Sequence, residues 1–170
     1  MLVLGIDPGT ATTGYGVIRE TDAGDPEMVD FGVILTPAGL PLEMRLLQLH
    51  QQLQEIILLH RPQSAAVEKL FFQKNVRTAM AVGQARGVIL LALAQAGVPL
   101  AEYTPLEVKQ AVAGYGAADK KQVQEMVKAL LHLAKIPKPD DAADALAIAI
   151  CHLHSSRVDQ MLQWGAASDE

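Results

Sequence analysis

Short blocks of hydrophobic residues, separated by turn-forming residues, open the chain and recur further along it. Blocks rich in β-branched and aromatic residues at 2–7, 12–20 and 28–35 predict three strands joined by short turns. Two further apolar runs, at 64–68 and 98–103, predict two more strands. Because short turns join antiparallel neighbours, we expect the first three strands to pair in antiparallel fashion.

Hydrophobic residues spaced by three or four positions mark much of the remaining chain as helical. A leucine and isoleucine stripe predicts a helix over 41–60, and a long segment rich in alanine, valine and leucine predicts another over 76–96. Capping residues, glycines and prolines delimit three more helices, over 105–113, 119–133 and 140–154.

This order of elements predicts an α/β fold. Three antiparallel strands followed by strand–helix units form a mixed five-stranded sheet with helices on both faces, in which the first, fourth and fifth strands run parallel. We assign one domain to residues 1–157. Residues 158–170 are polar and weakly patterned, and we expect them to form a flexible C-terminal tail.

Composition fits one globular domain and excludes several other classes of protein. The 170 residues are 50% hydrophobic and 19% charged, which argues against disorder. No apolar run approaches the roughly 20 residues of a membrane span, and the N-terminal segment lacks the basic start of a signal peptide. With one cysteine, Cys151, no intrachain disulfide can form. We therefore expect a cytoplasmic protein without a membrane partner.

Charge is segregated along the chain. The formal net charge is −5, yet residues 69–138 hold ten Lys and Arg against four carboxylates. The flanking segments, 1–68 and 139–170, are acidic. Such a pattern indicates either a basic face that binds phosphate or solvated helix faces whose charges cluster, and the sequence alone leaves both open.

Four acidic residues stand in apolar surroundings. Asp7 closes the first strand and Glu68 closes the fourth. Because the carboxyl ends of parallel strands lie at the ligand-binding edge of a sheet, these two side chains should converge. Asp141 and Asp144 are three residues apart on the last helix, so they share one face of it. Each of the four also has a plain structural explanation, as a turn former, a surface charge or a first-turn helix residue.

Four carboxylates in one place repel one another unless cations neutralise them. Hard divalent cations such as Mg²⁺ prefer oxygen ligands, and two of them about 4 Å apart assist hydrolysis of phosphodiester bonds. Taken together, the four residues therefore predict a site for two divalent ions in a nuclease.

Several motifs in order resemble the RuvC family of bacterial Holliday-junction resolvases. They are Leu4-Gly-Ile-Asp-Pro-Gly-Thr with Thr13-Gly-Tyr-Gly, Ala66-Val-Glu68, Gly83-Gln-Ala-Arg-Gly87, Tyr103-Thr-Pro and Asp141-Ala-Ala-Asp-Ala-Leu-Ala, over residues 1 to about 155. The resemblance implies a ribonuclease H-like fold and a homodimer. It also implies paired symmetric nicks in four-way DNA junctions during recombination and repair, with Mg²⁺ or Mn²⁺ as the cofactor.

By the same resemblance, the catalytic and metal-binding residues are Asp7, Glu68, Asp141 and Asp144. Basic residues near the scissile phosphate correspond to Lys109 and to Lys120 or its neighbour Lys121. Phe71 corresponds to an aromatic residue that stacks on bases at the junction point. A helicase machinery that drives branch migration is a possible partner in this family.

The segment after Glu68 has further residues suited to DNA. Phe71 and Phe72 are adjacent in a predicted loop, where one can enter the core while the other stacks on an unpaired base. Lys74, Asn75 and Arg77 follow at the start of a helix, where backbone N–H groups favour phosphate. We count all five as candidate DNA-binding residues, with burial of both rings in the core as the alternative.

Other conspicuous residues have structural explanations. His152 and His154 lie two positions apart on a helix and therefore point to different faces, so we expect them to be structural rather than metal ligands. Cys151 on the same apolar helix should be a core thiol. The segment from Val76 to Leu93 is apolar on more than one face, which indicates a second packing partner such as another copy of the chain.

Three other functions compete with this one. A related ribonuclease H-like nuclease could act on RNA, since nothing in the sequence reads a 2′-hydroxyl. The segment Leu4–Thr10 also resembles the phosphate loop of actin-like and sugar-kinase ATPases, but the chain has no second glycine-rich phosphate loop. A DNA-binding module without catalysis would leave the carboxylates unexplained.

Overall fold

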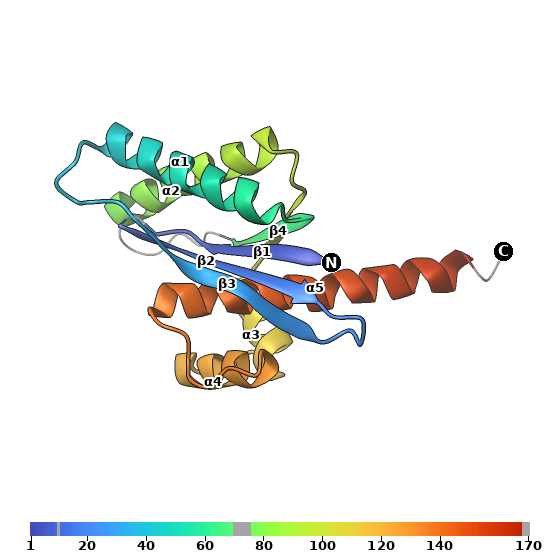
Figure 1. Cartoon of the computed structure of the whole chain (residues 1–170). Helices are drawn as coiled ribbons and strands as arrows, with labels where there is room; N and C mark the ends of the chain where they lie inside the picture. Colours follow the sequence, from blue (N-terminus) through green and yellow to red (C-terminus); the bar gives the residue numbers. More distant parts are fainter. Residues whose placement is uncertain (10, 70–75, 168–170) are drawn as a thin grey trace.

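The structure, a computed structural model, describes residues 1–9, 11–69 and 76–167, and side chains as far as Val158. Three strands come first, two strand–helix units follow a helix, and the chain ends in helices, as Figure 1 shows. The strands are β1 Leu2–Asp7, β2 Thr12–Glu20, β3 Pro26–Leu35, β4 Ser64–Glu68 and β5 Leu100–Tyr103. The helices are α1 Leu42–His60, α2 Val76–Gln95, α3 Pro105–Ala113, α4 Lys120–Leu130 and α5 Asp140–Ala167.

The strands form one mixed sheet in the order β3-β2-β1-β4-β5. β1 pairs antiparallel with β2, and β2 with β3, whereas β1, β4 and β5 run parallel. The predicted α/β fold and its strand directions are therefore confirmed. Since β1 and β4 are parallel neighbours, their carboxyl ends lie side by side at one edge of the sheet.

Helices cover both faces of the sheet, as predicted (Figure 1). On one face, α1 and α2 enclose a core that includes Leu53 and Ile89. On the other face, α3, α4 and α5 enclose a second core, to which α5 contributes Leu146 and Ile150. The sheet is thus buried on both sides, and α5 lies directly against it.

Glycines in the sheet let α5 approach so closely. A Cβ on Gly5 of β1 would overlap the backbone carbonyl oxygen of Ala145, and one on Gly14 of β2 would overlap that of Asp141. A Cβ on Gly16 would lie 2.8 Å from the side chain of Leu146. The backbone of α5 therefore rests on the backbone of β1 and β2, and this contact sets the height of the acidic helix above the sheet.

Most predicted boundaries agree with the structure, but that of the last helix was wrong. α5 continues to Ala167 instead of ending at His154, so the predicted boundary between residues 157 and 158 falls inside a continuous helix. No proline interrupts this stretch, and Arg157 donates a hydrogen bond of 2.8 Å to Glu20 of β2, which holds the helix beyond His154. The flexibility of the predicted tail stays a prediction.

Two other elements are shorter than predicted. β5 begins at Leu100 rather than at residue 98, because the N–H of Val98 is still bonded to Leu93 at the end of α2. α4 ends at Leu130 rather than at residue 133, because His132 takes the left-handed conformation, with φ of 52°. Neither change moves a candidate site residue.

A substitution at Gly5 tests the close contact between helix and sheet. Gly5→Ala should destabilise the protein by about 1–3 kcal/mol, because the new methyl group must push α5 away from β1. Gly39→Ala is the matched control, since a Cβ there meets no atom within 4 Å and should change stability by less than ~0.5 kcal/mol. Urea denaturation measures both; equal effects would contradict this account of the packing.

Candidate active site

The predicted carboxylates gather at the carboxyl edge of the sheet. Asp7 ends β1, Glu68 ends β4, and Asp144 projects from the second turn of α5. Together they line a cleft of about 210 Å³ between the sheet edge and α3, α4 and α5. Lys109 of α3 and Lys120 of α4 line the same cleft. Residues from five elements, up to 137 positions apart in the sequence, thus meet in one place.

The rest of the cleft wall is apolar, which the sequence did not predict. It is formed by the largely buried side chains of Pro105, Val108, Val123, Ala147 and Ile148. These residues come from α3, α4 and α5, and the sequence pattern does not predict how these helices pack against one another. Low polarity behind the carboxylates strengthens every charge interaction within the cleft.

Asp7 is the most perturbed carboxylate of the site. Burial raises its pKa to about 8, and the charges of Asp144, Glu68 and Asp141 contribute in the same direction, while Lys120 opposes them. The pKa values of Glu68 and Asp144 are also raised, in both cases chiefly by burial. Asp144 adds to the rise at Glu68, and Lys109 counteracts it. The two lysines of the cleft thus offset only part of the negative charge of its carboxylates.

Asp141 stands apart from the other three. It is partly exposed and is not among the residues that line the cleft. Its charge nevertheless raises the pKa values of Asp7 and Asp144, so it lies near both. The predicted group of four therefore consists of three carboxylates in the cleft and one at its margin.

Lys120 is the counter-charge built into the site. Its Nζ lies 3.1 Å from Oδ2 of Asp144 and 3.6 Å from Oδ2 of Asp140. The sequence did not predict the contact with Asp140. Burial lowers the pKa of Lys120, but the hydrogen bond and charge of Asp144, together with Asp140, raise it above its usual value. Lys121, the alternative in the sequence, is exposed and lines a different cleft between α3 and α4.

The donor set of the cleft suits a hard divalent cation. Asp7, Glu68 and Asp144 offer only carboxylate oxygens, which Mg²⁺ and Mn²⁺ prefer. A cation would relieve both the burial of charge and the mutual repulsion that together raise the pKa of Asp7. Within the described ranges, no three acidic, His or Cys side chains are already close enough to form a metal cage.

The candidate DNA-binding residues fall into two groups. Phe71, Phe72, Lys74 and Asn75 lie outside the described residues. Arg77 is exposed in the first turn of α2, away from the cleft lining. The two lysines of the cleft, on α3 and α4, are the basic residues that the structure brings to the carboxylates.

The two histidines of α5 have separate partners, as their spacing predicted. The ring of His152 is hydrogen-bonded at both nitrogens, to Tyr103 and Ser64, and Nδ1 of His154 is bonded to the backbone carbonyl oxygen of Ala111. Cys151 is buried, and burial raises the pKa of its thiol to about 11. It is a core thiol, as expected.

A family model described as crossover junction endodeoxyribonuclease RuvC matches residues 3–152. The chain belongs to the RuvC family. A relative from Chloroflexus aurantiacus, named crossover junction endodeoxyribonuclease RuvC, is 64% identical over 92% of this chain and 94% of its own length. One of the same name from Syntrophomonas wolfei is 56% identical over 98% of this chain and 96% of its own length.

Solved structures agree with this assignment. Thermus thermophilus RuvC, in complex with a Holliday junction substrate, superposes with a TM-score of 0.89 at 39% identity, covering 94% of this chain and 96% of that one. The yeast mitochondrial Holliday junction resolvase has a TM-score of 0.61 at 15% identity, covering 89% and 78%, and shares the fold. The predicted family, fold and class of enzyme, an endodeoxyribonuclease, are confirmed, and the ATPase and passive-binder alternatives are set aside.

The raised pKa of Asp7 predicts a pH-dependent stability. In the folded, metal-free protein the pKa is about 8 against 3.8 for an unperturbed aspartate, so folding favours the protonated form. The stabilisation from this group is complete below about pH 4 and is lost as the pH rises to about 8. The side chain in Asp7→Asn stays neutral at every pH. Between pH 4 and pH 9, the free energy of unfolding of this variant should therefore rise by about 2 kcal/mol or more relative to that of the unmodified protein.

Urea denaturation in the presence of a chelator, at about pH 4 and about pH 9, measures this difference. Asp22→Asn replaces an exposed carboxylate in the β2–β3 turn and is the control, for which we expect no such gain. A gain of the same size at both pH values would show that Asp7 is not the titrating group.

Proposed function

We propose that this chain resolves four-way Holliday junctions by hydrolysing one phosphodiester bond in each of two opposing DNA strands, during recombination and repair. The observation that carries this proposal is the convergence of Asp7, Glu68 and Asp144 with two lysines in one cleft. Membership of the RuvC family, and the junction-bound Thermus thermophilus relative, support DNA as the substrate in preference to RNA.

Each side chain of the cleft has a distinct task in this proposal. Asp7, Glu68 and Asp144, with Asp141 at the margin, hold two divalent ions, Mg²⁺ or Mn²⁺. Such ions would supply activation of the attacking water and stabilisation of the charge on the leaving oxygen. In the reaction that we propose, water attacks the scissile phosphate in line, while the cleft carboxylates and lysines would orient it, and the 3′ oxygen leaves. The products are a 3′ hydroxyl and a 5′ phosphate, which a ligase can rejoin.

The lysines offset negative charge on the phosphate. Lys120, which like any lysine is protonated at neutral pH, exchanges its contact with Asp144 for the pentacovalent phosphate. Lys109 faces the same cleft from α3 and acts beside it. Because Lys121 lines another cleft, we assign it at most a contact with the DNA backbone.

The other DNA contacts that we propose involve residues that follow β4 in the sequence. Phe71, Phe72, Lys74 and Asn75 come within seven positions after Glu68, a residue of the cleft lining. We propose that its aromatic residues stack on unpaired bases at the junction point and that its polar residues, with Arg77, contact phosphates. A base stacked on an aromatic side chain contributes about 1–3 kcal/mol to binding.

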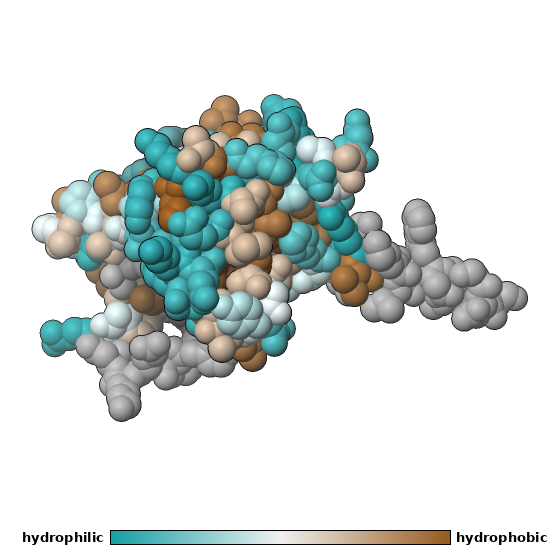
Figure 2. Space-filling model, turned by 90° about the horizontal axis from the view of Figure 1, so that it is seen from below, coloured by the Kyte–Doolittle hydropathy of each residue, from teal (hydrophilic) through white to brown (hydrophobic). Residues whose placement is uncertain are grey.

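The outer face of α1 and α2 supports a homodimer. α2 alone among the described helices is apolar and long enough to cross a membrane, a test that ordinary core helices also pass. One side of it packs on the sheet, but Met80 and Leu91 on its outer side remain 62% and 53% exposed. Leu58 and Leu59 of neighbouring α1 are also exposed. By contrast, the α3–α4 side interleaves hydrophilic and hydrophobic side chains (Figure 2).

We propose that a second copy of the chain covers the face formed by α1 and α2. A twofold dimer matches the approximate twofold symmetry of a four-way junction and presents two clefts to opposing strands. Because the relatives come from bacteria, whose DNA lies in the cytoplasm, we propose the same location for this chain. A branch-migration helicase is the partner we expect there.

A nicking assay with matched variants tests the proposed function. The chain should cleave a synthetic four-way junction, but not linear duplex DNA or an RNA of the same sequence, and only with Mg²⁺ or Mn²⁺. Asp7→Asn and Glu68→Gln should lower the rate by ~10²-fold or more. Their affinity for the junction should stay equal or increase, because less negative charge faces the DNA.

Gel-shift titrations over a range of salt concentrations complete this test. Binding should weaken steeply with salt, as expected when lysines contact phosphates. If Asp7→Asn lost junction affinity in step with its activity, Asp7 would be a binding rather than a catalytic residue. Cleavage in a chelator would refute the proposed role of divalent ions.

A charge on the outer face of α2 tests the dimer. Met80→Asp should turn the dimer into a monomer in analytical ultracentrifugation and abolish paired nicking, because an aspartate cannot be buried between two apolar faces. Met126→Asp, on α4 and 37% exposed, is the control and should leave the dimer intact. A dimer that survives Met80→Asp would place the interface elsewhere.

A further inference from the structure

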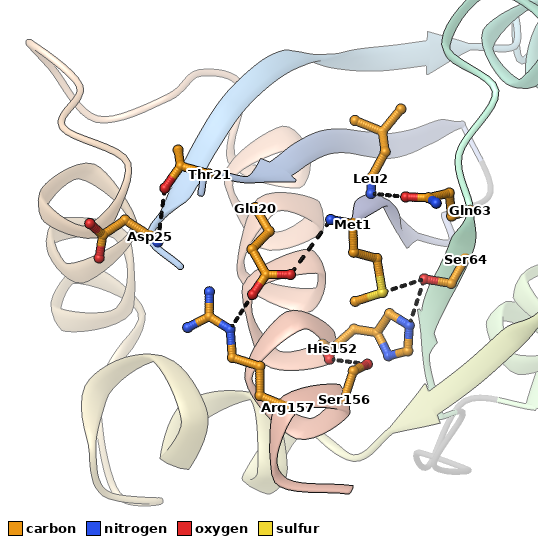
Figure 3. A network of polar contacts seen from close by, with 10 residues as sticks. All are labelled: Met1, Leu2, Glu20, Thr21, Asp25, Gln63, Ser64, His152, Ser156 and Arg157. Carbon is orange, nitrogen blue, oxygen red and sulfur yellow. Dashed lines mark hydrogen bonds and ion pairs between the residues drawn. The ribbon is translucent and has the colours of Figure 1, made fainter. Parts of the chain in front are cut away.

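Helix α5 packs against one face of the sheet, and strand β4 of that sheet meets it at both of its ends. At the site end, Glu68 and Asp144 line the same cleft. At the other end, the first residue of β4, Ser64, is hydrogen-bonded through its Oγ to Nε2 of His152, at 3.0 Å (Figure 3). β4 runs toward the cleft and α5 runs away from it.

The stretches of β4 and α5 between the cleft and the Ser64–His152 contact have similar lengths. From Ser64 to Glu68 the strand advances about 13 Å, at roughly 3.3 Å per residue. From Asp144 to His152 the helix advances about 12 Å, at 1.5 Å per residue. The contact at Ser64 therefore fixes how far along the strand Asp144 lies, and a slide of α5 along its axis would displace Asp144 from Glu68 by the same amount.

Tyr103 adds a second connection from the adjacent strand. It lies directly opposite Glu68 in the pairing of β4 with β5, and its carbonyl oxygen accepts a hydrogen bond of 2.7 Å from the N–H of Lys69. Its hydroxyl lies 2.9 Å from Nδ1 of His152. The backbone beside Glu68 is thus tied to α5 through the same imidazole ring.

The imidazole of His152 suits this position. Only 8% of the residue is exposed, and the neighbouring residues of α5 are apolar and fully buried, so a lost hydrogen bond would leave a polar atom without water. A neutral imidazole donates from one nitrogen and accepts at the other, while both hydroxyls can do either. A neutral ring can therefore make both bonds, and sliding the helix by one residue would break both.

We propose that His152 and Tyr103 are positioning residues, which set the register of α5 along β4 and thereby hold Asp144 at its working distance from Glu68. This inference rests on the proposed function, in which those two carboxylates share divalent ions. The glycines of β1 and β2 determine the height of α5 above the sheet, whereas this pair determines its position along its own axis.

Three variants separate positioning from simple stability. Tyr103→Phe removes one hydroxyl without changing volume, His152→Leu removes both hydrogen bonds, and His152→Gln keeps an amide that can reach Ser64. Ile150→Val, in the core on the same helix, is the control, because it loosens packing without touching the polar contacts. Each is compared below its unfolding transition for single-turnover nicking rate, junction affinity and binding of Mn²⁺ alone to the DNA-free protein.

We expect His152→Leu to lower the nicking rate by about 10–100-fold at unchanged junction affinity, since a misplacement of 1 Å can cost about 10²-fold. Tyr103→Phe should lower it less, and His152→Gln should recover part of the loss. Mn²⁺ binding should weaken in the same order. Ile150→Val should change stability only.

Rates and Mn²⁺ affinities within twofold of the unmodified protein for both Tyr103→Phe and His152→Leu would overturn the proposal, whatever their melting temperatures, and would make His152 an ordinary buried histidine. A parallel loss in Ile150→Val would overturn it as well. If the unmodified protein failed to nick junctions, the proposed function would fall, while Mn²⁺ binding by the free protein would still decide whether these residues position the carboxylates.

Discussion

The close contact between helix α5 and the sheet determines the rest of this structure. Gly5 and Gly14 have no side chain, so the backbone of α5 rests on β1 and β2 near the carbonyl groups of Ala145 and Asp141. This brings the acidic turn of the helix to the carboxyl edge of the sheet, where Asp7 ends its strand. A thicker layer between helix and sheet would keep these carboxylates apart.

The carboxylates of the cleft repel one another, and the rest of the fold offsets the cost in stability. Burial and neighbouring carboxylates together raise the pKa of Asp7 to about 8, and Lys120 offsets only part of that charge. Two apolar cores, one on each face of the sheet, stabilise the fold enough to offset this repulsion. The faces also divide the tasks of the protein, since α3, α4 and α5 build the cleft while α1 and α2 present the apolar outer surface.

Much of this arrangement could be predicted because it is local. Hydrophobic spacing and capping residues located the strands and helices, and the parallel relation of β1 to β4 already implied that Asp7 and Glu68 converge. The end of α5 was missed because its anchor is the distant Glu20, which pairs with Arg157. The roles of Lys120 and Lys121 were also open, because adjacent helix residues differ only in the direction they face.

The sequence by itself determined the types of element, their order, the acidic residues at strand ends and the family. It could do so because these depend on neighbours a few positions away and on motifs with fixed spacing. Only the tertiary structure decided that Asp141 lies at the margin of the cleft, that Val108 and Ile148 form its apolar wall, and that His152 joins two strands. Those contacts depend on the position and rotation of each helix against the sheet. The close packing of many side chains, from all parts of the chain, sets that position.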